Sequence, residues 1–185
     1  RASFDYRPNV DHRIRMGGDY LFHIFRPEQS NMSSWYKDSV ITQMNNTVFS
    51  HSLIHGHEVS AYAEDEMSLT DRLRVNAGLR FTLFHVEGKT YQSLQPRFSA
   101  RYLLGRRVSA KVSYTKMNQY IHRLSNSYIS QPTDIWVPVT GNIRPMNAHQ
   151  VTGGLAWHYQ GLDFSAEGYY KRMNNLVEYK DNGPA

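Results

Sequence analysis

The chain has 185 residues, a formal net charge of +5 and no cysteine. Apolar residues make up 40% of it and the mean hydropathy is −0.60, so no segment offers the run of about 20 apolar residues that a transmembrane helix needs. The lack of cysteine excludes disulfides, thiolate metal sites and cysteine nucleophiles. Lysine and arginine are dispersed along the chain, which argues against nucleic-acid binding.

Alternation of apolar and polar residues is the main structural signal along the chain. A strand points successive side chains to opposite faces, so a period of two indicates a sheet with one apolar and one polar face. Taken in order, this signal predicts eight strands at residues 2–6, 12–25, 56–65, 73–85, 94–104, 107–117, 148–159 and 162–179.

The alternation is clearest in residues 73–85, where Leu79 and Phe81 belong to the apolar parity and Arg74 and Arg80 to the polar one. A strand that crosses a membrane needs about 9–11 tilted residues, and this segment is long enough. A half-buried sheet in a soluble protein alternates in the same way. A soluble β-sandwich that acts as a binding or adhesion module is therefore the alternative.

The connections between the expected strands alternate in length. Long segments at residues 26–55 and 118–147 and a medium loop at 87–93 are separated by short turns, including one at residues 67–71. Outer-membrane barrels have short periplasmic turns and longer extracellular loops. The connections therefore favour an antiparallel meander of about eight strands that forms part of a transmembrane β-barrel.

Several sequence runs resemble one known family. They are NQYIHRL at 118–124, PTDIWVP at 132–138, EGYYKRM at 167–173 and LVEYK at 176–180, preceded by YAEDE at 62–66 and LRVNAGLR at 73–80. In this order they resemble the barrel of TonB-dependent outer-membrane receptors, particularly those of Bacteroidetes-type bacteria. The resemblance covers most of residues 56–180.

This resemblance implies a function in nutrient uptake. Such receptors import a siderophore, cofactor, glycan or peptide through a plugged barrel of about 22 strands. Residues 1–185 would be part of that barrel domain, cut from a longer polypeptide and without the plug. The implied partners are outer-membrane lipid, the TonB complex through the missing plug region, a small nutrient ligand and, as a further candidate, a surface lipoprotein. No cofactor is implied.

The polar parity of the expected strands carries a set of cations. An anionic substrate could be drawn to these side chains, or they could form an ordinary polar barrel wall paired with Asp19, Glu58, Glu64, Asp163 and Glu167. We expect the wall. The lumen-facing candidates are Arg74, Arg80, Arg97, Arg101 and Lys111, accompanied by Arg13 and Arg15.

The second long connection supplies the candidate ligand-binding residues Asp134, Trp136, His122 and Arg123. Trp136 and Asp134 lie between prolines, so they could bind a sugar or chelate, or pack the loop against the barrel rim. We expect packing.

A histidine group at the end of the first long connection is a weak metal candidate. His51, His55 and His57 lie near Glu58, but their spacing matches no ligand pattern, and a solvated loop end is the simpler interpretation. No nucleophile elbow, phosphate loop or carboxylate pair is present, so we do not expect an enzyme.

Overall fold

The computed structural model describes residues 1–25, 53–124, 135–140 and 143–177. Within these ranges every regular element is a strand. No helix among them is both long and apolar enough to cross a membrane. The strands are β1 (Ala2–Tyr6), β2 (His12–Phe25), β3 (Ile54–Thr70), β4 (Leu73–Val86), β5 (Lys89–Leu103), β6 (Val108–Gln119), β7 (Ile121–Leu124), β8 (Ile135–Pro138), β9 (Met146–Tyr159) and β10 (Leu162–Asn174).

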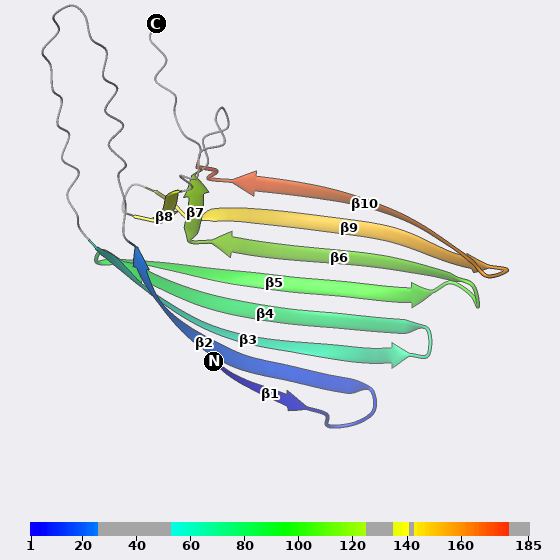
Figure 1. Ribbon diagram of the computed structural model, residues 1–185. Coiled ribbons are helices and arrows are strands. Elements are labelled where there is room, and N and C mark those ends of the chain that lie inside the picture. Colours follow the sequence, from blue (N-terminus) through cyan, green and yellow to red (C-terminus); the bar gives the residue numbers. More distant parts are fainter. Residues whose placement is uncertain (26–52, 125–134, 141–142, 178–185) are drawn as a thin grey trace, which may run out of the picture.

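Eight of these strands form one sheet in the order β1-β2-β3-β4-β5-β6-β9-β10, and every neighbouring pair is antiparallel (Figure 1). The sheet is an open meander with β1 and β10 at its edges. β7 and β8 pair only with each other. The prediction of an all-β meander of about eight strands is confirmed.

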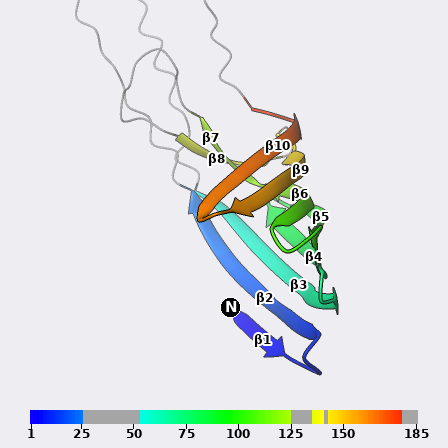
Figure 2. The same cartoon turned by 90° about the vertical axis from the view of Figure 1, so that its right-hand side faces the viewer.

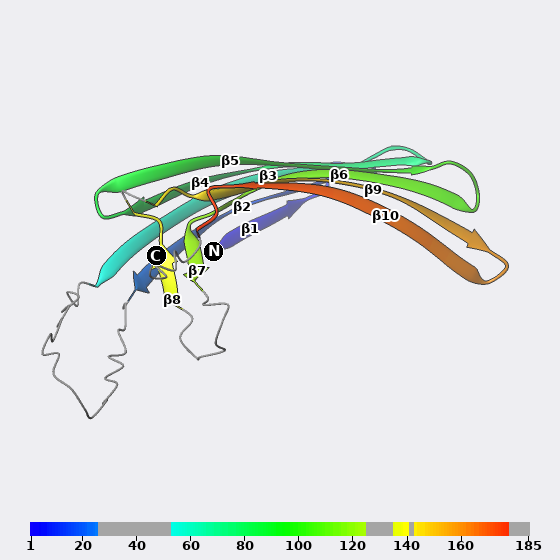
Figure 3. The same cartoon turned by 90° about the horizontal axis from the view of Figure 1, so that it is seen from above.

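The sheet is curved, and its two faces differ. Seen from the side, the strands form an arc (Figure 2), and seen from above, β7 and β8 lie under the concave side of the sheet (Figure 3). Phe84 of β4 contacts Tyr120, which immediately precedes β7. The even-numbered residues of β4 therefore face the concave side. Cross-strand partners share a face, so the pairing register of the sheet assigns each residue of its strands to the concave or the convex face.

The convex face is apolar over most of its area. Leu79, Val112 and Leu155 belong to it and are 46%, 46% and 56% exposed. A β-sandwich would cover such a face with a second sheet, whereas in the described residues the other sheet, β7–β8, lies on the concave side (Figure 3). The arrangement contradicts the sandwich alternative.

Four predicted segments differ from the structure. β3 continues to Thr70 through the expected turn at residues 67–71. The expected medium loop at 87–93 is mostly strand, because β5 begins at Lys89 after a two-residue turn. Glu87 and Gly88 both have positive φ, 47° and 73°, as a type I′ hairpin turn requires. The connection at 118–147 contains β7 and β8, and β10 ends at Asn174 instead of 179.

Candidate functional site

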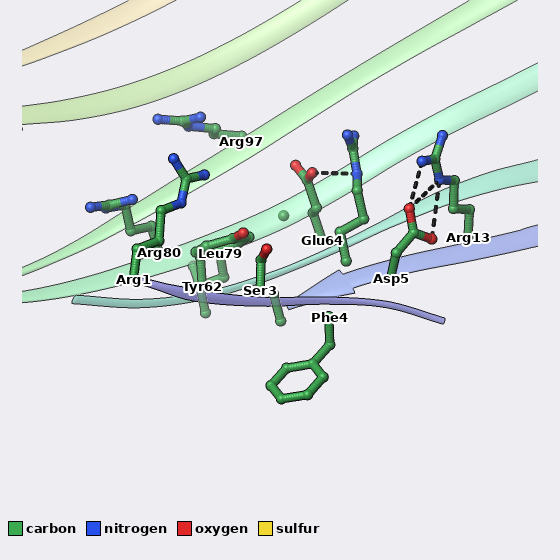
Figure 4. Close-up of a pocket in the computed structure, with 13 residues that line it drawn as sticks. Arg1, Ser3, Phe4, Asp5, Arg13, Tyr62, Glu64, Leu79, Arg80 and Arg97 are labelled. Atoms are coloured by element: carbon green, nitrogen blue, oxygen red, sulfur yellow. Dashed lines mark hydrogen bonds and ion pairs between the residues drawn. The ribbon is translucent and has the colours of Figure 1, made fainter. Parts of the chain in front are cut away.

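The concave face holds a hollow of about 530 Å³ lined by strands β1 to β5. Figure 4 shows arginine side chains gathered around it, together with two carboxylates. The charged lining residues are Arg1, Arg13, Arg15, Arg80, Arg97, Asp5 and Glu64. Positive side chains therefore outnumber negative ones at this hollow.

Part of this positive charge is compensated by ion pairs. Asp19 lies 3.4 Å from Arg1 Nε and 3.3 Å from Arg80 Nη2. Arg80 also donates a hydrogen bond of 2.6 Å to Ser60 Oγ. Arg15 is paired with Glu64 at 2.8 Å, and Arg13 with Asp5 (Figure 4). Of the expected acidic partners, Asp19 and Glu64 thus pair with arginines on the β1–β4 side of the sheet, whereas Asp163 lies 2.6 Å from His158.

The other candidates lie on the same face without such compensation. Arg74, Arg101 and Lys111 are direct cross-strand partners on β4, β5 and β6. Arg97 belongs to the same face of β5. Among the described residues these four side chains make no ion pair. Like charges directly opposite each other are destabilising, so this row of cations favours an anion beside it.

Two acidic residues on the concave face lie near this row in the register: Glu66 of β3, the partner of Asn76 and thus diagonal to Arg74, and, beyond Gly154, Glu167. Glu167 is the cross-strand partner of Gly154, which in turn is the partner of Lys111. A Cβ added to Gly154 would lie 2.9 Å from Glu167 Cγ, so the glycine lets this side chain lean toward β6. Two carboxylates therefore lie beside the three cations of the row, and the net charge remains positive.

A second concave feature lies at the end of the sheet where the long connections leave. Phe84, Val86, Tyr120 and Val139, here called the rim cluster, pack together with exposures between 0% and 5%. Val139 N–H donates to the Tyr120 carbonyl at 2.8 Å, and Tyr120 Oη donates to Ser93 Oγ. Tyr91 Oη donates to the Thr140 carbonyl. These contacts hold the β7–β8 hairpin against β4 and β5.

His122 of β7 is 5% exposed, and its Nε2 has no hydrogen-bond partner among the described residues. Burial lowers the pKa of His122, and a backbone hydrogen bond with Arg144 offsets part of this effect. Burial also disfavours the charged form of Tyr120 and therefore raises its pKa. Both rings are therefore held in their neutral forms at pH 7.

The other loop candidates are only partly placed. Arg123 pairs through its backbone with Trp136 across β7 and β8. Asp134 lies outside the described residues. The hairpin thus brings His122, Arg123 and Trp136 to the same end of the sheet, which is compatible with the expected packing at a rim.

The histidine candidates are separated from their proposed carboxylate. His55 and His57 are on the convex face, where His57 Nδ1 is 2.9 Å from Tyr20 Oη and Phe22 contacts both rings. Glu58 is on the concave face, 3.3 Å from His23. His51 lies outside the described residues, which contain no group of three potential metal ligands.

The rim cluster was missed by sequence reasoning. The sequence places Phe84 and Tyr120 near the longer connections without indicating that they touch, and Val139 carries no signal at all. The contact of Phe84 with Tyr120 joins residues far apart in the chain, and periodicity does not report such contacts.

Comparison with known proteins identifies the family. A family model described as "TonB dependent receptor-like, beta-barrel" matches residues 1–185. Among curated proteins, no sequence matches. Solved structures match in fold at low identity, and this chain spans only about a quarter of the length of each.

The FrpB iron transporter from Neisseria meningitidis matches with a TM-score of 0.66 and 15% identity, covering 94% of this chain and 28% of that one. The siderophore receptor PirA from Acinetobacter baumannii matches with a TM-score of 0.65 and 14% identity, covering 94% and 26%. The alcaligin outer-membrane receptor FauA from Bordetella pertussis matches with a TM-score of 0.53 and 16% identity, covering 94% and 28%. The chain therefore belongs to the TonB-dependent receptors of the bacterial outer membrane and forms part of their β-barrel.

Proposed function

We propose that the full-length receptor imports an anionic iron chelate and that the concave face of this chain lines the path of that cargo. The observation that carries the proposal is a set of four concave cations that make no ion pair with any described residue, namely Arg74, Arg97, Arg101 and Lys111. A surface of one charge sign raises the local concentration of ligands of the opposite sign.

The orientation of the sheet in the membrane supports this assignment. Barrel interiors are polar and lipid-facing surfaces apolar, which matches the concave and convex faces. The β2–β3 and β6–β9 connections are the longest, and both leave from the end that carries the rim cluster (Figure 1). We therefore assign this end to the extracellular side, where His122, Arg123, Asp134 and Trp136 would contribute to ligand capture.

The cargo class is supported by the names of the structural neighbours. These are an iron transporter, a siderophore receptor and a receptor for alcaligin. Many iron chelates are anionic at pH 7, and a cation-rich wall suits them. Energy and gating would come from TonB and from a plug outside residues 1–185, as the resemblance implies. The family consists of transport receptors, and the proposal requires no catalytic step.

The test uses the full-length receptor in a strain deleted for its gene. Growth is measured on a panel of limiting nutrients that includes anionic, neutral and cationic iron chelates. The Arg97→Gln/Arg101→Gln variant is expected to lower uptake of anionic chelates several-fold and to leave neutral ones unchanged. Arg72→Gln is the matched control, because this arginine lies in the exposed β3–β4 turn.

Three outcomes would contradict the proposal. Equal growth of wild type and the double variant on every anionic chelate would show that these cations do not line the cargo path. Loss of uptake for all cargoes alike would show that the cations pack against the plug instead. Uptake that persists after deletion of TonB would refute the importer assignment itself.

A further inference from the structure

A row of basic side chains crosses the convex face, opposite to the concave cations. It consists of Lys116 on β6, His149 on β9 and Arg172 on β10, and His149 is the direct cross-strand partner of both others. Such partners have Cβ atoms about 4.5–5.5 Å apart. The three side chains therefore form one continuous basic surface, here called the basic row.

The residues on either side of the basic row fix its position along the strands. The next convex-face partners toward the short turns are Tyr114, Val151 and Tyr170, and beyond them this face is apolar as far as Trp157 and Phe164. The next partners toward the long connections are Asn118, Asn147 and Asn174, with a 2.8 Å hydrogen bond from Asn174 Nδ2 to Asn147 Oδ1. The basic row thus lies where an aromatic girdle gives way to amides, as at a membrane interface.

The basic row lacks an acidic partner in the part of the chain that the structure describes. Lys116 and Arg172 make no ion pair among the described residues. The convex positions of β6, β9 and β10 contain no aspartate or glutamate. His149 Nδ1 is 3.0 Å from Tyr114 Oη, which orients the imidazole and leaves its other nitrogen available. The row therefore presents uncompensated positive charge to whatever covers the barrel at this level.

We propose that the basic row binds the phosphate group of an anionic lipid headgroup in the outer leaflet. The face is the one that contacts lipid, and the row lies at the extracellular edge of its apolar band. Arginine presents a planar fork that matches phosphate oxygens, and lysine adds a point charge. A ligand with acyl chains would extend over the apolar band below the row, which a free phosphate ion or a soluble anion would not use. This proposal depends on the barrel orientation and not on the cargo.

The test is lipid binding by the purified full-length receptor in nonionic detergent, read by native mass spectrometry. The probes are diphosphorylated lipid A, the same lipid after phosphatase treatment, and inorganic phosphate. We expect wild type to retain the phosphorylated lipid and the Lys116→Gln/Arg172→Gln variant to bind it about tenfold or more weakly, because charge-assisted hydrogen bonds are lost. Lys171→Gln is the matched control, since this neighbouring lysine belongs to the concave face.

Each outcome decides the proposal. Equal binding of the phosphorylated lipid by wild type and the double variant would overturn it, as would equal binding of the dephosphorylated lipid by wild type. Displacement of the lipid by millimolar inorganic phosphate would show that the site accepts free phosphate and not specifically a headgroup. If the double variant does not fold, as judged by its circular dichroism, Arg172→Gln alone is compared with Lys171→Gln. A cargo other than an iron chelate would leave all these results unchanged.

Discussion

The ring of Tyr120 stacks on the ring of Phe84 with centroids 5.0 Å apart and 10° between their planes. Phe84 is fully buried, although it lies on the polar, concave face of β4. Its burial is explained by the chain that follows β6, which folds back over this face and forms the β7–β8 hairpin. The stack therefore ties a connection on the proposed extracellular side to the barrel wall.

Removal of the Tyr120 ring should release the hairpin. Because Tyr120 is 5% exposed, we expect Tyr120→Ala to cost about 3–5 kcal/mol of local stability, as large-to-small changes of aromatic residues do. Tyr120→Phe keeps the stack and loses only the hydrogen bond to Ser93, worth about 0.5–1.5 kcal/mol. Hydrogen exchange of the Val139 amide, which donates to the Tyr120 carbonyl, reports both changes. Equal exchange in the two variants would show that the ring does not hold the hairpin.

Acidification should loosen the same hairpin through His122. Burial lowers the pKa of this imidazole, so the released hairpin binds a proton more readily than the docked one. Docking is therefore at full strength above the ordinary histidine pKa of about 6.5 and weakens as the pH falls below it toward the lowered pKa. Exchange of the Val139 amide, corrected for its intrinsic pH dependence, is expected to rise between pH 7.5 and pH 5. His122→Gln should abolish this rise, and a rise that persists in that variant would assign the effect to another group.

The type I′ turn between β4 and β5 offers a test of backbone conformation. Gly88 has a φ of 73°, and a Cβ at this position would meet no atom within 4 Å. Any cost of Gly88→Ala is therefore conformational and should be about 1–2 kcal/mol. Gly105→Ala is the control, because that Cβ also meets nothing and its φ lies outside the left-handed region. Denaturation midpoints of the two variants should differ, and equal midpoints would contradict the assigned turn.

Alternation predicted the membrane-crossing parts of the sheet well. The bounds of β2 agree with the prediction, and β4 differs by a single residue. The method relies on a contrast between an apolar and a polar face, and this contrast disappears beyond the apolar band. Thr90 and Gln92 make the convex face of β5 as polar as Ser93 makes the concave one, so this strand extension was predicted as a loop.

The functional residues divide in the same way. The parity of Arg74, Arg80, Arg97, Arg101 and Lys111 follows from local periodicity, and the structure places all five on one face. Periodicity does not show which of these five cations forms an ion pair with a carboxylate. Arg80 reaches Asp19 across two strand pairings, through a register that only the assembled sheet defines.

The assignment of the two faces can be tested by adding a charge on the convex face and removing one from the concave face. Leu79 lies in the middle of β4 on the convex face, between the cross-strand partners Ala63 and Pro96. Lys111 lies on the concave face of β6. A cation that faces lipid near the bilayer midplane costs about 2–4 kcal/mol, whereas substitutions in the lumen are mild. We therefore expect Leu79→Arg to lower the unfolding free energy of the full-length receptor by this amount and Lys111→Gln to change it little.

Chemical denaturation in lipid vesicles measures both effects, and Leu79→Met serves as a control of similar volume. Nitroxide labels at Leu79 and Arg80 provide a second readout, since oxygen partitions into the bilayer and an aqueous quencher into the lumen. The Leu79 label should relax faster with oxygen, and the Arg80 label should respond to the aqueous quencher. If both labels respond alike, or if Leu79→Arg and Lys111→Gln cost the same, the convex face is not the one that contacts lipid, and the proposed basic row would lose its lipid partner with it.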